Sequence, residues 1–150
     1  MKIYFGFGWI SSGKNWKKSF KLPGAFSLFE DYSKRFSFYA PFEAGPLPGA
    51  ANRNASKIWL CDTSPSAKQL SSEDLSKKLS QLLDSGTKEL DVLIGGPDGF
   101  SSETIAGLKP DLRWNFGPLT LPHELAAVVA AEQLYRAWTI LHRLPYHKGH

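Results

Sequence analysis

The chain has 150 residues, of which 42% are apolar and 21% charged, so disordered and collagen-like classes are excluded and a single domain over residues 1–150 is expected. No apolar run is long enough to span a bilayer, and the one cysteine, Cys61, excludes an internal disulfide and favours a reducing cytoplasm. The net charge of +4 and the isoelectric point near 9.2 are only mildly basic, so the clustering of charge is more informative than its total.

The first half of the chain predicts two strands, one helix and a strand-like core segment. Residues 2–8 are apolar, end in glycines and predict a strand. A helical pattern follows but breaks at Leu22-Pro23-Gly24, because proline cannot continue the helical hydrogen-bond ladder. The expected elements after this break are a helix over 25–34, a strand over 36–42, a loop over 45–49 and a buried strand over 58–61.

The second half alternates helices and strands more clearly. Ser71 and Ser72 are suited to cap a helix whose leucines lie at helical spacing, and Gly86 is suited to end it. The remaining expected elements are strands over 91–94 and 112–116, a short helix from Ser101 that stops before Pro110, and a long helix over 122–142. Strands alternating with helices predict an α/β domain with a largely parallel sheet flanked by helices.

Two clusters of basic residues could contact phosphates. The first holds Lys14, Lys17, Lys18 and Lys21, interleaved with aromatic rings, and the second gathers Arg143, His147 and Lys148 at the C-terminus. Solvated lysines on a helix face explain the first cluster equally well, and a loose tail is the alternative for the second.

A glycine-rich turn, Gly95-Gly96-Pro97-Asp98-Gly99, follows the strand predicted over 91–94. A strand that runs into such a turn and then a helix is a common way to hold a nucleotide, because a ligand can approach the bare backbone. The turn matches neither the dinucleotide fingerprint nor the phosphate loop. Taken alone, it is a tight turn of the kind that more often has a purely structural role.

Four longer strings carry more information than this turn. They are Leu93–Phe100 (LIGGPDGF), Leu119–Leu125 (LTLPHEL), Glu132–Trp138 (EQLYRAW) and Leu144–Lys148 (LPYHK). In this order and spacing the chain closely resembles the RlmH family of SPOUT methyltransferases over about residues 57–148. The resemblance implies transfer of a methyl group from S-adenosylmethionine (SAM) to N3 of a pseudouridine in large-subunit (23S) ribosomal RNA.

The resemblance also implies a SPOUT-type α/β domain with a C-terminal trefoil knot, one of the rare exceptions to unknotted topology. It further implies a cytoplasmic homodimer that acts on ribosomal RNA in the large subunit or the assembled ribosome, without a membrane or a metal. Three loops are expected to hold SAM mainly through backbone groups and apolar walls. The residues carried over by motif are Cys61, Gly95, Gly96, Phe116, Gly117, Pro118, Leu119, Thr120 and Leu121; a buried core role also fits Cys61.

Methylation of an imide nitrogen requires loss of its proton, so a base or polarising group and positive charge are expected near it. The candidates are His147, placed first, then Tyr146, Arg136 and His123. A surface ion pair with Glu132 explains Arg136 equally well, as does a structural hydrogen bond for His123. The family implies that the tail with Tyr146 and His147 completes the site across a dimer interface.

Two other functional interpretations stay open at this stage. One is a non-catalytic RNA- or ribosome-binding protein with a SPOUT fold, and the other is a SPOUT methyltransferase that acts on another RNA. A metal site is disfavoured, since the spacing of His142, His147 and His150 matches no zinc pattern. Compared with the family, residues 14–24 are longer and residues 44–56 lack a charged helix, so RNA docking is expected to differ.

Overall fold

A computed structural model describes residues 1–11, 14–49 and 56–147. Within these residues, six parallel strands form one sheet in the order β2-β1-β5-β3-β6-β4. The strands are β1 (Lys2–Phe7), β2 (Phe42–Pro46), β3 (Ser56–Cys61), β4 (Lys68–Gln69), β5 (Glu89–Ile94) and β6 (Leu112–Asn115). The helices are η1 (Trp16–Ser19), α1 (Ala25–Ser37), α2 (Ser72–Asp84), α3 (Ser102–Leu108) and α4 (His123–Leu141). The α/β class with a parallel sheet is therefore confirmed, whereas the trefoil knot stays a prediction.

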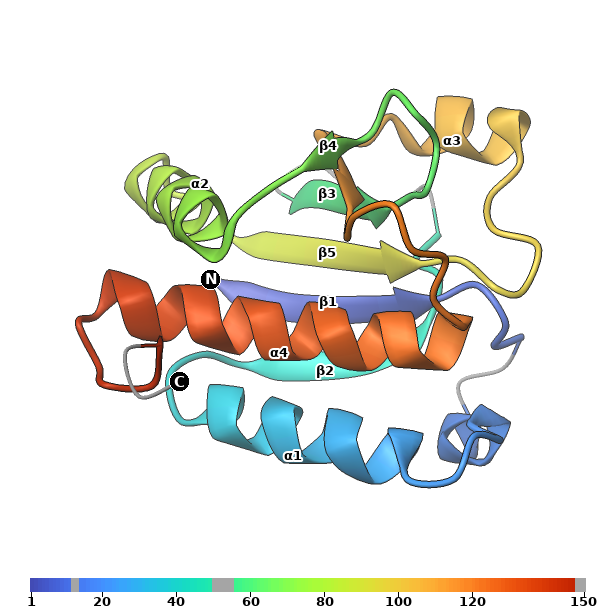
Figure 1. The fold of residues 1–150 in the computed structure, drawn as a ribbon, viewed down its shortest axis with the longest axis horizontal. Coiled ribbons are helices and arrows are strands. Elements are labelled where there is room, and N and C mark those ends of the chain that lie inside the picture. Colours follow the sequence, from blue (N-terminus) through green and yellow to red (C-terminus); the bar gives the residue numbers. More distant parts are fainter. Residues whose placement is uncertain (12–13, 50–55, 148–150) are drawn as a thin grey trace.

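Helices cover both faces of the sheet. On one face α4 packs between α1 and α2, over the larger apolar core (Figure 1). On the other face α3 covers a smaller cluster formed by Ile58, Leu60, Leu93 and Leu108. Successive strand residues point to opposite faces, so both layers draw on β3 and β5, and four of the six residues in each of these strands are apolar.

The capping signals of the sequence are confirmed at α2. Ser71 accepts a hydrogen bond from the backbone N–H of Asp74 at 3.0 Å, and the Asp74 carboxylate accepts one from the backbone N–H of Ser71 at 3.2 Å. This reciprocal capping satisfies two backbone donors at the helix start. Gly86 follows the helix with a φ of 75°, the left-handed conformation that glycine adopts without strain.

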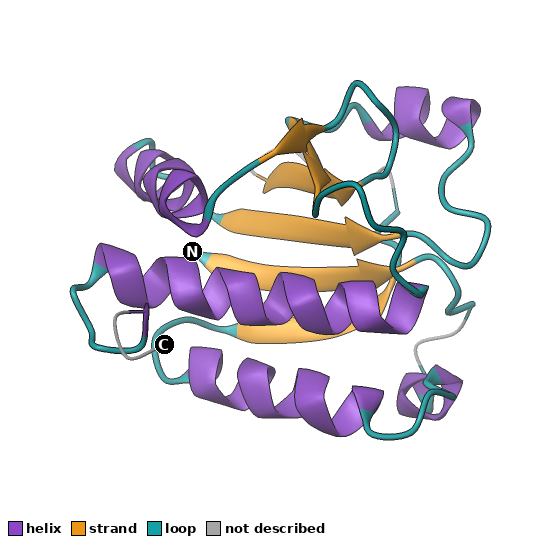
Figure 2. Cartoon of the chain, viewed as in Figure 1, coloured by secondary structure: helices purple, strands orange, loops and turns teal. Residues whose placement is uncertain are grey.

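The strand expected over 36–42 is wrong. Helix α1 continues to Ser37, and β2 begins only at Phe42 (Figure 2). The cause is packing, because Phe36 is buried seven residues after Phe29 and its ring lies 5.1 Å from that of Trp138 on α4. The loop expected over 45–49 accordingly begins later, since Gly45 and Pro46 belong to β2. Residues 50–55 of the segment without a charged helix lie outside the described residues.

The direction of α4 determines where the functional residues lie. The strands of the sheet all point the same way, and α4 begins near their carboxyl ends and runs back toward their amino ends (Figure 1). Its 19 residues span about 28 Å at a rise of 1.5 Å per residue. His123 therefore lies at the carboxyl edge of the sheet, while the C-terminal tail begins at the opposite edge.

Candidate functional site

A cavity of about 590 Å³ opens at the carboxyl edge of the sheet. Three loops form it, one after each of the neighbouring strands β5, β3 and β6, and the first turns of α4 close one side. Ligands of parallel α/β sheets commonly bind at this edge, because the loops there vary without disturbing the core. The lining residues are Cys61–Thr63, Ile94–Phe100, Trp114–Phe116, Leu119–His123 and Ala126.

The second of the three loops, residues 95–99, is held tightly by its glycines. The backbone N–H of Gly99 donates to the carbonyl of Gly96 at 2.9 Å, and Gly99 has a φ of 69°. A Cβ at Gly95 would lie 2.9 Å from the Cα of Gly99, whereas one at Gly96 would meet Trp9 at an ordinary 3.6 Å. Glycine at position 95 is therefore required by the loop itself, independently of any ligand.

The first loop, which follows β3, is fixed by an ionic network. The Asp62 carboxylate accepts hydrogen bonds from the backbone N–H of Ser64 at 3.0 Å and from Arg113 Nε at 2.7 Å, and Arg113 also donates to Ser64 Oγ at 2.7 Å. Burial raises the pKa of Asp62, but the hydrogen bonds from Ser64 and Arg113 outweigh it and hold this pKa below its usual value. Asp62 is therefore a charged clamp for the loop at neutral pH.

Cys61 lines the cavity at the end of β3 but is not suited to act as a nucleophile. Burial raises the pKa of its thiol far above the ordinary value, and the nearby Asp62 carboxylate raises it further. The thiolate is the reactive form of cysteine, so a thiol in this environment is inert near neutral pH. Cys61 serves as a small apolar wall residue, which combines the two roles expected for it.

The third loop follows β6 and separates two cavities. Asn115 Oδ1 accepts a hydrogen bond from the backbone N–H of Gly117 at 2.8 Å, where the backbone turns with a φ of 118°. A second cavity of about 380 Å³ shares the wall Trp114–Phe116 with the first and is also lined by Gly117. Leu119, in contrast, is 75% exposed at the rim of the first cavity.

His123 stands at the start of α4 and lines the larger cavity. Its ring packs edge-on against Trp9 with the ring centroids 4.5 Å apart, and its Nε2 lies 3.8 Å from the Glu124 carboxylate. Glu124 is 5% exposed and accepts hydrogen bonds from the backbone N–H groups of Lys21 and Leu22 at 3.0 and 2.8 Å. A buried carboxylate with two N–H donors is satisfied, so Glu124 fixes the residue 14–24 segment against α4.

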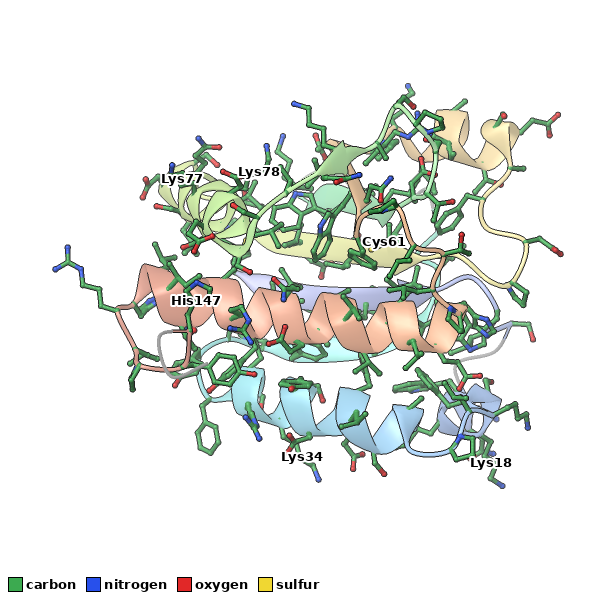
Figure 3. All side chains as sticks on the ribbon, in the orientation of Figure 1. Lys18, Lys34, Cys61, Lys77, Lys78 and His147 are labelled. Atoms are coloured by element: carbon green, nitrogen blue, oxygen red, sulfur yellow. The ribbon has the colours of Figure 1, made fainter. Side chains whose placement is uncertain are left out.

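The other three catalytic candidates form a separate cluster between α4 and the tail that follows it. Arg136 donates two hydrogen bonds to Glu132 Oε1 at 2.9 and 2.7 Å, Tyr146 donates to the same oxygen at 3.1 Å, and Arg136 Nη1 lies 3.1 Å from His147 Nδ1. His147, labelled in Figure 3, in turn has its Nε2 2.8 Å from Glu73 Oε1 at the start of α2. The surface ion pair considered for Arg136 is therefore present.

This cluster does not line the larger cavity of its own chain. The nearest of its members on α4, Glu132, lies six residues after Ala126, the last residue of α4 that lines the cavity, which corresponds to about 9 Å along the helix. Burial, aided by hydrogen bonds to Tyr32 and Glu132, raises the pKa of Tyr146 far above its ordinary value. In this arrangement Tyr146 is a hydrogen-bond donor and not a base.

The predicted cofactor residues divide between the two cavities. The larger cavity is lined by seven of the nine: Cys61, Gly95, Gly96, Phe116, Leu119, Thr120 and Leu121. Gly117 lines the smaller cavity, and Pro118 lines neither. The sequence interpretation missed the clamp of Asp62 and Arg113 and the Asn115 hydrogen bond, although Asp62 directly follows a predicted strand.

Among the described residues, no group of three or more His, Cys, Asp or Glu side chains could hold a metal ion. Over the same part of the chain, no helix combines the length and apolar character that crossing a membrane requires. Lys148 and His150, named in the sequence interpretation, lie outside the described residues.

The three-loop cavity at the carboxyl edge of a parallel sheet agrees with a match to a known family. The family model described as "Predicted SPOUT methyltransferase" matches residues 18–147 of the chain. The chain therefore belongs to the SPOUT methyltransferase family, and its fold is the SPOUT fold.

Within this family the chain is similar to proteins named Ribosomal RNA large subunit methyltransferase H. It is 40% identical to the protein of Deinococcus deserti over 136 residues, covering 85% of this chain and 92% of that protein. It is 38% identical to that of Stenotrophomonas maltophilia over 140 residues, covering 81% and 88%. The protein of Psychrobacter cryohalolentis is 45% identical over 93 residues, which cover 62% of this chain. The chain spans about half, 54%, of the length of that relative. The resemblance to the RlmH family is confirmed.

Proposed function

We propose that this protein transfers a methyl group from SAM to N3 of a pseudouridine in large-subunit ribosomal RNA. The observation that carries the proposal is the cavity of about 590 Å³ that three loops build at the carboxyl edge of a SPOUT-family sheet. Relatives that match most of their own length are named as methyltransferases of large-subunit ribosomal RNA. A change of RNA target or a loss of catalysis would leave the same fold, so activity requires a direct test.

The cavity suits SAM in size and in the chemistry of its walls. Its volume lies within the range of about 300–1,000 Å³ that is typical of small-molecule sites. Apolar side chains from all three loops line it, and the backbone of Gly95 and Gly96 in its wall offers hydrogen-bonding groups. We infer that these loops hold the adenosine and that the clamp of Asp62 and Arg113 fixes the first loop in the binding conformation.

The chemistry divides between the cofactor and the chain. SAM supplies a methyl group already activated on a sulfonium, so the residues of the protein must orient the uracil-type ring and remove its imide proton. His123 lines the cavity and is the proposed proton acceptor on this side of the site. A positive charge beside the ring would stabilise the anion that develops, and Arg136 is the proposed source, held by Glu132 in a fixed orientation.

The positions of Arg136, Tyr146 and His147 support a homodimeric site. Arg136 lies ten residues after Ala126, the last residue of α4 that lines the larger cavity, which corresponds to about 15 Å along the helix. Tyr146 and His147, in the tail that follows α4, contact Glu132 and Arg136 and do not line that cavity. We infer a two-fold dimer in which the tail of one subunit approaches the cavity of the other. Leu125 of α4 is half-buried within one chain and lines neither cavity, so we infer that it contributes to the interface. The expected location is the cytoplasm, where the ribosomes are.

The direct test is SAM binding by titration calorimetry in the presence of a chelator, followed by transfer of labelled methyl groups to large ribosomal subunits and to assembled ribosomes. Micromolar SAM binding without a metal and a label recovered in methylated pseudouridine would support the proposal. Absence of binding heat at high SAM concentration would contradict it and favour a non-catalytic RNA-binding protein. A label recovered in another RNA would contradict the proposed RNA target but not the methyltransferase activity.

A further inference from the structure

The segment of residues 14–24 carries all of the excess positive charge of the chain. It contains four lysines and no acidic residue. The whole chain has 18 lysines and arginines against 14 acidic residues, so the remainder carries basic and acidic groups in equal number. Charge gathered in one segment produces a local positive potential that the small net charge of the protein conceals. The four residues are Lys14, Lys17, Lys18 and Lys21.

The four lysines of this segment are exposed, whereas its aromatic rings turn inward. Trp16 and Phe20 pack against the buried Phe7, with ring centroids 5.8 and 5.5 Å apart. Lys17 lies 3.8 Å from the Glu30 carboxylate, so its charge is partly offset. Because both rings are half-buried and pack against the core, the segment presents mainly ammonium groups to a partner and offers little platform for stacking bases.

The segment is fixed beside the cofactor cavity. The buried Glu124 carboxylate accepts the backbone N–H groups of Lys21 and Leu22, and Glu124 directly follows His123 in the cavity wall. Trp9 bridges the two regions, since its ring contacts both Phe20 and His123. The segment is therefore held in a defined position next to the start of α4, which forms part of the cavity wall, at the end of the molecule where Lys18 is labelled in Figure 3.

We propose that residues 14–24 form a docking surface for the phosphate backbone of the RNA strand whose nucleotide enters the cavity. The inference rests on the proposed function and adds the surface by which the substrate is bound. A polyanionic strand is the partner that exposed ammonium groups without free aromatic rings fit best. Lysine acts on phosphate as a point charge and carries no base selectivity, so this surface positions the RNA and does not specify its sequence.

The test compares two double variants that remove equal charge. Lys18→Gln with Lys21→Gln removes two cations from the docking surface while the backbone hydrogen bonds to Glu124 are kept. Lys77→Gln with Lys78→Gln removes two cations from α2, at the opposite end of the molecule (Figure 3). For each protein, the affinity for purified large ribosomal subunits is measured over a series of salt concentrations, and SAM affinity is measured by calorimetry.

The inference predicts that the Lys18 and Lys21 variant binds subunits about 10-fold or more weakly at low salt. The slope of log affinity against log salt should fall in magnitude by roughly 1.4–1.8, about 0.7–0.9 for each lost phosphate contact. SAM affinity should be unchanged, and the KM for RNA should rise while kcat is kept. The α2 variant should bind as the unmodified protein does.

Equal losses in both double variants, or an unchanged salt slope in the first, would overturn the docking surface. Failure of the unmodified protein to bind large subunits at low salt would also overturn the docking surface. These outcomes are distinct from a failure of the proposed function. Selective loss of binding in a protein that transfers no methyl group would contradict the activity and support the surface, whereas normal methylation with unchanged binding would contradict the surface alone.

Discussion

Glu124, the second residue of α4, accepts a hydrogen bond from the backbone N–H of Leu22 at 2.8 Å, across 102 residues of sequence. Its other carboxylate oxygen accepts from the backbone N–H of Lys21 at 3.0 Å. One buried side chain thus joins the lysine-rich segment of residues 14–24 to the helix that carries His123. The conformation of the segment therefore depends on hydrogen bonds to α4, the helix that forms part of the cavity wall.

Replacement of Glu124 by glutamine should loosen this junction. An amide retains one acceptor oxygen but presents an N–H₂ group to the second backbone donor, which is then left unpaired. We expect a loss of about 1–3 kcal/mol in the free energy of unfolding. Denaturant titration measures it, and limited proteolysis should show earlier cleavage within residues 14–24. Glu103→Gln on the exposed start of α3 is the control, and equal stability of the two variants would contradict the junction.

The two glycines of the second loop should respond differently to a methyl group. A Cβ at Gly95 would lie 2.9 Å from the backbone of Gly99, so Gly95→Ala should distort the loop, and Gly95→Val should abolish SAM binding in a protein that still folds. A Cβ at Gly96 would make only an ordinary contact with Trp9. Calorimetry should therefore find a much larger loss for Gly95→Ala than for Gly96→Ala, with circular dichroism reporting the fold. The reverse order would show that the loop is misassigned.

Asp62→Asn should lower the stability of the protein by loosening the first loop. It should also remove the part of that stability that depends on pH. The pKa of Asp62 is lowered in the folded protein, so its contribution to stability is present above its unfolded pKa of about 3.9 and is lost as the pH falls through the folded value. The stability difference between the unmodified protein and the variant should be about 1–3 kcal/mol near pH 7 and should shrink below about pH 4. SAM affinity near pH 7 should fall as well. A difference that stays constant with pH would contradict a charged clamp.

A shared site predicts complementation between two inactive variants. Gly95→Val lacks a functional cofactor loop, and a chain truncated after Pro145 lacks Tyr146 and His147. A mixed dimer of the two contains one site with an intact loop and an intact tail, so partial methylation of ribosomes should return on mixing. Each variant alone provides the baseline. A monomer in sedimentation, or no recovery in proven mixed dimers, would mean that each subunit builds its site alone.

Local signals in the sequence were sufficient for much of the fold. The cap at Ser71, the end at Gly86 and the apolar strands over 58–61 and 91–94 depend on neighbouring residues and were predicted correctly. The strand over 36–42 was not, because Phe36 is held in α1 by Trp138, which is remote in sequence. The two-residue strand β4 was missed because so short a pairing leaves no periodic pattern.

The parts of the site that consist of consecutive residues could be predicted from the sequence. The parts that depend on contacts between residues far apart in the sequence could not. The glycine turn and the loop before α4 were located as strings, and both line the larger cavity. The clamp between Asp62 and Arg113 joins residues 51 positions apart, so no local pattern reveals it. The tail cluster of Arg136, Tyr146 and His147 was named from its motif, but its distance from the cavity of its own chain required the structure.

The most direct test of methylation is mass-spectrometric mapping of ribosomal RNA from cells with and without the gene for this protein. Loss of the gene should remove one methyl group from one pseudouridine of the large-subunit RNA. Expression of the unmodified protein should restore it, whereas expression of Gly95→Val should not. An identical set of modifications in the two strains would contradict the proposed activity.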